Sequence, residues 1–193
     1  MISRRKSALA LAGIALAAHF SIATAAEEHP KVKLATSLGD IVVELEPEKA
    51  PLTVENFLQY VKDKHYDGTI FHRVIDGFMI QGGGFDTKQQ QKPTREPIQL
   101  ESKNGLKNDT YTIAMARTAN PHTATAQFFI NVKNNDMLNA PKPDGYGYTV
   151  FGKVIKGQDV VDKIKAVPTQ DRGGAFQNLP TTPVVIQSAT LIK

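Results

Sequence analysis

Short runs of β-branched and apolar residues, separated by Gly, Pro, Asn and Asp, dominate the chain from Val32 onward. Such runs are typical of strands in an antiparallel sandwich or barrel. The predicted strands are residues 32–36, 41–45, 69–74, 78–81, 98–100, 112–116, 128–132, 149–154 and 184–192. The first two flank a four-residue turn segment and therefore indicate a hairpin.

Two segments depart from the strand pattern. Pro51 occupies a first-turn position, and apolar residues follow it at helical intervals, at Val54, Phe57, Leu58 and Val61. This spacing predicts an amphipathic helix with its apolar stripe on the core. A second, shorter helix is expected over 158–165, after Gly157. A mainly β chain with one helix near each end predicts a closed antiparallel barrel capped by two helices.

The N-terminus has the order of a secretory signal peptide. Basic residues at 4–6 precede an apolar run over 8–20, and small residues continue to Ala26. The apolar run is shorter than the roughly 20 residues that span a bilayer, so cleavage is favoured over a retained anchor. We therefore expect residues 1–26 to be removed and residues 27–193 to form one domain. The arginine pair leaves both the general and the twin-arginine export route open.

Removing that segment changes the charge. It contains three of the 23 basic residues and none of the 19 acidic ones, which leaves 20 basic against 19 acidic side chains and a net charge of +1. No basic stripe with interleaved aromatic residues remains, so nucleic acid is not an expected partner. The chain has no cysteine, which excludes disulfides, a thiol nucleophile, a lipoprotein anchor and a cysteine zinc site. We expect a periplasmic or secreted protein without stable membrane association.

The motifs of several enzyme classes are missing. The chain has no nucleophile elbow, Walker loop, dinucleotide-binding fingerprint or zincin helix. The histidines after the signal segment are scattered, at His29, His65, His72 and His122. Neither a metal nor a cofactor is therefore expected. The glycines at 82–84 lack the following helix of a phosphate loop and indicate a tight turn or close backbone packing.

The most distinctive run is FHRVIDGFMIQGG, which begins at Phe71. Period-two geometry would place Phe71, Arg73 and Ile75 on one side of a strand. His72 and Val74 would lie on the other side. His72 is therefore expected to be structural rather than catalytic.

A turn at Asp76 and Gly77 follows, and Met79 and Gln81 should share one side of the next strand. The hairpin would bring one guanidinium and one amide together. An arginine whose stem only covers apolar surface remains the alternative interpretation of Arg73 by itself.

The whole run closely resembles the signature of the cyclophilins, most of all their bacterial periplasmic members. Three further motifs follow in the family's order: IAMAR at 113–117, QFFI at 127–130 and VFGKV at 150–154. The resemblance extends over about 33–192. It implies an eight-stranded barrel with two capping helices, a proline-binding groove on its outer surface, and peptidyl-prolyl cis/trans isomerase activity.

The resemblance also implies roles for individual residues. Arg73 corresponds to the catalytic arginine. The proline pocket corresponds to Phe78, Met79, Phe129 and Leu138. The positions that hold the substrate backbone correspond to Gln81, Ala116 and Gln127. The expected partners are proline-containing unfolded or flexible polypeptides, bound by a monomer.

Two groove positions depart from the family pattern. Met137 stands where the family commonly has Trp, and Tyr148 stands where it often has His. The missing indole removes a hydrogen-bond donor and a rigid wall, so cyclosporin binding is expected to be weak.

Two rival functions remain. The same fold could bind proline peptides, or act as a periplasmic chaperone, without accelerating isomerisation. A barrel of the lipocalin kind would instead enclose a small ligand, but it needs a hollow interior. Bulky residues occur at both the odd and the even positions of the predicted strands, which favours a barrel whose interior is filled by side chains.

Overall fold

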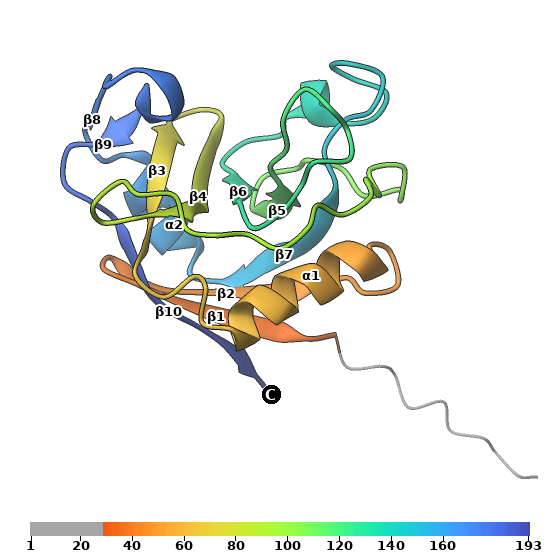
Figure 1. The fold of residues 1–193 in the computed structure, drawn as a ribbon, viewed down its shortest axis with the longest axis horizontal. Coiled ribbons are helices and arrows are strands. Elements are labelled where there is room, and N and C mark those ends of the chain that lie inside the picture. The colour runs from red at the N-terminus through yellow and green to blue at the C-terminus, as the bar shows by residue number, and fades with distance from the viewer. Residues whose placement is uncertain (1–28) are drawn as a thin grey trace, which may run out of the picture.

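The computed structural model describes residues 29–193, so the predicted signal peptide lies outside the described residues. Within this range eight strands close into an antiparallel barrel in the order β1, β10, β3, β4, β6, β5, β7, β2 (Figure 1). The strands are β1 (Lys31–Thr36), β2 (Gly39–Leu45), β3 (Thr69–Ile75), β4 (Met79–Asp86), β5 (Thr112–Met115), β6 (Phe128–Asn131), β7 (Val150–Lys156) and β10 (Val185–Ile192). The predicted closed barrel is confirmed.

Helix α1 (Pro51–Lys62) begins at the proline, as predicted. Its first free amides, those of Leu52 and Thr53, donate to the carboxylate of Glu101 at 3.1 and 2.8 Å. The apolar stripe faces the barrel, where the ring of Phe57 lies 5.8 Å from that of Phe128. The helix is therefore fixed at its start by a carboxylate and along its length by aromatic packing.

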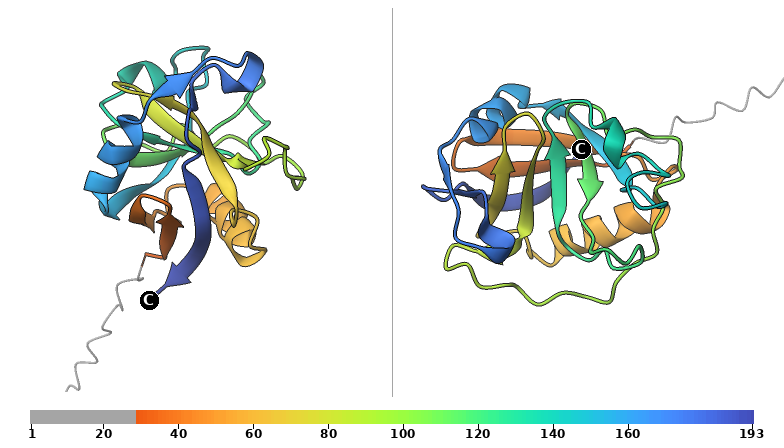
Figure 2. Two further views of the ribbon diagram at one scale, coloured as in Figure 1. Left: turned by 90° about the vertical axis from the view of Figure 1, so that its left-hand side faces the viewer. Right: turned by 90° about the horizontal axis from the view of Figure 1, so that it is seen from above.

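Helix α2 (Gln158–Lys165) occupies the predicted range and lies on the opposite side of the barrel from α1 (Figure 2). It buries Val160, Val161 and Ile164. Gly157 precedes it with φ +88°, and a Cβ there would lie 2.2 Å from the carbonyl oxygen of Asp40. Only glycine fits this close approach of the helix start to the β1–β2 hairpin.

Bulky side chains fill the barrel. The fully buried set includes Phe71, Ile80, Ile113, Phe128 and Phe151. The ring of Phe128 packs edge-on against those of Tyr66 and Phe71, at 5.5 and 6.2 Å. This interior contradicts the hollow barrel that a lipocalin-like function would need. No helix within residues 29–193 has the length and apolarity needed to cross a membrane.

The predicted strand at 98–100 is wrong. Only Ile98 pairs there, in an isolated bridge with Ala124. Pro97 lacks an amide hydrogen, and the segment lies outside the barrel, so a ladder does not propagate.

Four short elements had not been predicted. They are β8 (Thr169–Gln170), β9 (Leu179–Pro180) and the 3-10 turns η1 (Asp136–Leu138) and η2 (Gly174–Phe176). Segments of two or three residues are too short to show a period in the sequence.

Candidate active site

A row of directly opposed residues crosses the outer surface of strands β3, β4, β6 and β5. Arg73 pairs with Gln81, and Gln81 pairs with Phe129. Phe129 in turn pairs with Ala114. Opposed residues in antiparallel strands project from the same face with Cβ atoms about 4.5–5.5 Å apart. The sheet thus places a guanidinium, an amide and an aromatic ring side by side.

The β3 strand reaches this row through a bulge, which corrects one prediction. Phe71 pairs with Gly82 and Arg73 pairs with Gln81, so β3 has one more residue here than β4. The extra residue resets the alternation of side chains. Phe71 and Val74 both enter the barrel core, whereas Ile75 packs on the outer surface. The prediction that Phe71 shares a side with Arg73 and Ile75 is therefore wrong.

Beside the row lies a second apolar cluster, separate from the barrel core, which we call the groove cluster. Its buried members are Met79, Ala114, Phe129, Leu138 and Val150. Partly buried residues packed against it are Ile75, Phe78, Leu106, Ala116 and Tyr148. All four predicted pocket residues gather here. The structure adds Ile75, Leu106, Ala114 and Val150, which the sequence had not indicated.

Arg73 is half-buried and lies two residues before Ile75, which packs against this cluster. Among residues 29–193 its guanidinium has neither a hydrogen bond nor an ion pair. Its donors are therefore available to a bound molecule, and the arginine is not a structural ion-pair partner.

Two amides form the polar side of the site. Nε2 of Gln81 donates to Oε1 of Gln127 at 2.9 Å. Both line a cavity of about 330 Å³ whose other walls are Gln91, Thr94, Ala116, Arg117, Thr118, Thr123 and Thr125. The three residues predicted to hold a substrate backbone are thus adjacent, next to the groove cluster.

The glycine triplet explains how Gln127 fits. It lies inside β4, and a Cβ on Gly84 would be 2.6 Å from the side chain of Gln127. The close backbone packing predicted for these glycines is confirmed, whereas the alternative of a tight turn is not.

The two departures from the family pattern have different positions. Tyr148 packs edge-on against Phe129, with ring centroids 5.7 Å apart. Met137 lies on η1 with 56% of its surface exposed, outside the groove cluster. The side chain of Met137 therefore does not pack against the groove cluster.

His72 is buried, with its ring 4.7 Å from that of Phe85 and 6.4 Å from that of Phe176. Nδ1 has no hydrogen-bond partner within the described chain. Burial, together with the neighbouring charge of Arg73, lowers the pKa of His72 to about 4. A neutral, ring-packed histidine agrees with the expected structural role.

Sequence reasoning missed a network of buried asparagines behind the groove. Nδ2 of Asn135 donates to the carbonyl of Phe78 and to Oδ1 of Asn131, each at 2.7 Å. Nδ2 of Asn131 donates to Oδ1 of Asn108 at 3.2 Å, and Asn108 reaches the carbonyl of Leu138, also at 3.2 Å. The network fixes the backbone under two groove residues. The one signal for this network in the sequence was Asn131, a polar residue that ends the apolar run at 128–131.

Groups of His, Asp and Glu that could hold a metal ion are absent from the described part of the chain. The site brings together one free guanidinium, two amides and the apolar groove cluster.

The comparisons with known proteins agree on one family. The model described as "Cyclophilin type peptidyl-prolyl cis-trans isomerase/CLD" matches residues 31–191. The peptidyl-prolyl cis-trans isomerase cyp18 of Streptomyces antibioticus is 61% identical over 163 residues, which are 83% of this chain and 98% of that protein. The peptidyl-prolyl cis-trans isomerase A of Dickeya dadantii is 50% identical over 192 residues and the full length of both chains.

A solved structure gives the same result for the fold. The cyclophilin type isomerase of Cryptosporidium parvum, crystallised in the presence of the dipeptide Ala-Pro, superposes with a TM-score of 0.70 at 26% identity. The match covers 84% of this chain and 99% of that one.

Proposed function

This chain belongs to the cyclophilin-type peptidyl-prolyl cis/trans isomerases, and we propose that it accelerates rotation about X-Pro bonds in exported proteins, with Arg73 stabilising the twisted transition state. The isomerase activity is that of the family. The observation that carries the proposal for Arg73 is its free guanidinium in one row with Gln81 and Phe129, at the edge of the groove cluster.

The reaction needs neither a nucleophile nor a metal, because no covalent bond is broken. Amide resonance opposes rotation with a barrier of about 18–20 kcal/mol, so an unaided X-Pro bond takes tens to hundreds of seconds to isomerise. As the bond twists, resonance is lost and the prolyl nitrogen becomes a pyramidal hydrogen-bond acceptor. A guanidinium that donates to this nitrogen binds the twisted state better than the planar one. This difference in binding free energy lowers the barrier to rotation.

The groove cluster would hold the proline ring. Phe78, Met79, Phe129 and Leu138 are the apolar side chains that would contact a pyrrolidine. A dry wall strengthens the interaction of Arg73 with the nitrogen, because water is excluded. Gln81, Ala116 and Gln127 would hold the substrate backbone while the other side of the bond rotates.

A proline-peptide binder or chaperone on the same fold remains the second candidate, because a groove of this kind can hold a chain without accelerating it. Exchange NMR on a Pro-containing peptide separates the two. With the protein at a small fraction of the peptide concentration, an isomerase gives cis–trans exchange cross-peaks at short mixing times. A binder shifts or broadens the resonances and leaves the exchange rate at its uncatalysed value.

We propose that the chain acts outside the cytoplasm. The basic, apolar and small segments of residues 1–26 support a cleaved signal, and the family match begins only at residue 31. N-terminal sequencing of the protein recovered from a periplasmic fraction tests this. A new terminus after Ala25 or Ala26 supports export, whereas intact Met1 in the cytosolic fraction contradicts it.

We also propose weak cyclosporin binding by a monomeric protein. Met137 is exposed, and no indole is present anywhere in the chain to donate a hydrogen bond to the drug. An inhibition titration in the isomerase assay tests this, and inhibition at nanomolar cyclosporin would contradict it.

A further inference from the structure

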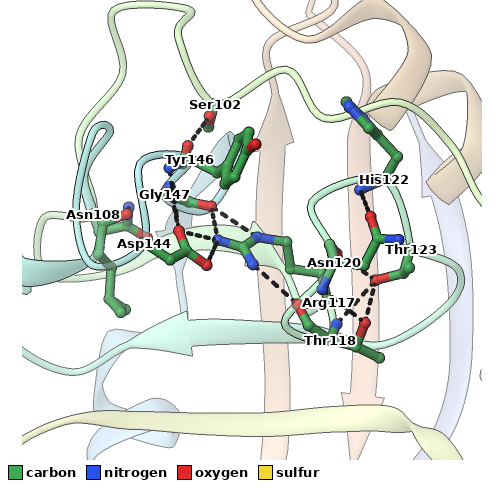
Figure 3. Close-up of polar contacts among 11 residues, drawn as sticks. Ser102, Asn108, Arg117, Thr118, Asn120, His122, Thr123, Asp144, Tyr146 and Gly147 are labelled. Carbon is green, nitrogen blue, oxygen red and sulfur yellow. Dashed lines mark hydrogen bonds and ion pairs between the residues drawn. The ribbon is translucent and has the colours of Figure 1, made fainter.

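The side chain of Arg117 is almost fully enclosed, although the residue lies only two positions after the end of β5, next to the site. Only 1% of it is exposed. Nε and Nη2 both donate to the carbonyl of Gly147, at 2.9 and 2.7 Å, and Nη1 donates to the carbonyl of Thr118 at 2.9 Å. Nη2 also pairs with the carboxylate of Asp144 at 2.8 Å. Figure 3 shows the guanidinium joined to two loops.

The flat face of the same guanidinium lies on an aromatic ring. Cζ of Arg117 is 4.4 Å from the centroid of Tyr148. Tyr148 in turn presents its ring at 78° to Phe129, 5.7 Å away. A continuous set of contacts therefore runs from Asp144 through Arg117 and Tyr148 to the ring at the centre of the groove cluster.

The charges favour this arrangement. The hydrogen bond from Arg117 lowers the pKa of Asp144, so the carboxylate stays ionised and keeps the guanidinium in place. The plane of the guanidinium is fixed by its hydrogen bonds to Gly147 and Thr118, which leaves its face free to stack. A cation held over a ring in a site sheltered from water is worth more than an exposed one.

We propose that Arg117 is a positioning residue for the isomerase site, which holds Tyr148 edge-on against Phe129 and so forms one wall of the proline groove before substrate binds. This proposal rests on the isomerase function and on Phe129 lining the groove. Arg117 acts through Tyr148. It therefore contributes to binding of the ground state and the transition state alike, and its loss should raise KM more than it lowers kcat.

A purely structural role for Arg117 makes a different prediction. If the arginine only fastened its two loops, its loss would lower the free energy of unfolding, and the folded fraction would retain its KM. Its effect would also be the same whether or not residue 148 has a ring on which to stack.

A double-mutant cycle separates these cases. The variants are Arg117→Gln, Tyr148→Leu and the combination, and the readouts are KM, kcat and the dissociation constant of a Pro-containing peptide. We expect Arg117→Gln to weaken peptide binding roughly 3- to 30-fold, the range of a sheltered cation–π contact. In the Tyr148→Leu background the same change should have less than about a twofold effect, because the contact is already lost. Equal effects in both backgrounds would overturn the proposal.

Two further variants keep the test decisive. Arg95→Gln is the matched control, because Arg95 also pairs with an aspartate, Asp63, but is half exposed and contacts no residue of the groove cluster. It should leave KM unchanged. If Arg117→Gln does not fold, Arg117→Lys replaces it in the cycle. Lysine keeps a cation over the ring but loses the planar fork, so peptide affinity should fall by no more than about threefold, and only when Tyr148 is present. A loss that is independent of Tyr148 would again overturn the proposal.

Discussion

The amide of Asn135 donates a 2.7 Å hydrogen bond to the main-chain carbonyl of Phe78, across 57 residues of sequence. This bond ties the η1 segment to the turn that starts β4. Because Asn135 also reaches Asn131 in β6, one side chain sets the spacing between two edges of the groove cluster. The shape of the groove thus depends on a residue that does not line it.

Replacement of Asn135 by Ala tests this dependence. Oδ1 of the buried Asn131 would lose its donor, and the carbonyl of Phe78 would keep only the amide of Val132, which costs about 1–3 kcal/mol of unfolding free energy. Urea unfolding should show this loss, and KM for a Pro-peptide should rise because Phe78 is no longer tied to Asn135. Asn120→Ala is the control, since Asn120 lies in an exposed loop. An unchanged urea midpoint in Asn135→Ala would contradict the account.

Gly84→Ala should move Gln127 without unfolding the barrel. The new methyl group would lie 2.6 Å from the end of a flexible side chain, which can turn away at low cost. Gln127 would then lose its bond to Gln81. We expect KM to rise roughly three- to tenfold, the equivalent of about one hydrogen bond, with little change in the unfolding midpoint.

The Gln127→Ala background provides the control for that experiment. With the amide gone, the methyl group at residue 84 has nothing to displace, so Gly84→Ala should add no further rise in KM. A full additional effect would mean that the methyl group acts on the strand itself.

His72 should make the stability of the fold depend on pH below neutrality. Its pKa is lowered to about 4 by burial, whereas in the unfolded chain it is near 6.5. Between these two values the unfolded chain binds a proton that the folded chain excludes, so stability falls as the pH falls from 6.5 to 4 and then levels off. The loss assigned to His72 is on the order of 3 kcal/mol.

The substitution His72→Phe isolates this contribution, because phenylalanine suits the neighbouring rings of Phe85 and Phe176 and does not titrate. Urea unfolding between pH 7 and 4 should show a smaller loss in the variant than in the wild type. A residual slope is expected from His65, whose pKa burial also lowers. Identical slopes for both proteins would contradict the assignment.

The periodic parts of the fold were predictable because each long element buries one face. The stripe at Val54, Phe57 and Val61 predicted α1, and its packing on Phe128 is the reason for the stripe. The bulge in β3 was not predictable, since Phe71 and His72 are both buried and the local pattern does not indicate which one enters the barrel. Ile98 is a single paired residue, and a single pair has no period.

The residues of the site likewise fall into a predictable and an unpredictable group. The residues that face the groove could be assigned from the resemblance, and they do lie together. The support behind them could not, because an asparagine such as Asn135 or an arginine such as Arg117 reads as a surface residue. Their burial depends on partners about 30 to 57 positions away. Met137, another position taken from the family pattern, is exposed outside the packed cluster, and its place in the groove stays a prediction.

The most direct test is the protease-coupled isomerase assay on wild type, Arg73→Ala and Arg73→Lys, with peptide affinity and urea unfolding measured on the same samples. The side chain of Arg73 makes no hydrogen bond or ion pair within residues 29–193, so Arg73→Ala should keep the wild-type unfolding midpoint. Loss of an aimed donor should lower kcat/KM on the order of 10²- to 10³-fold, with peptide affinity nearly unchanged and a partial recovery in Arg73→Lys. A folded Arg73→Ala protein with full isomerase activity would contradict the central role given to this residue.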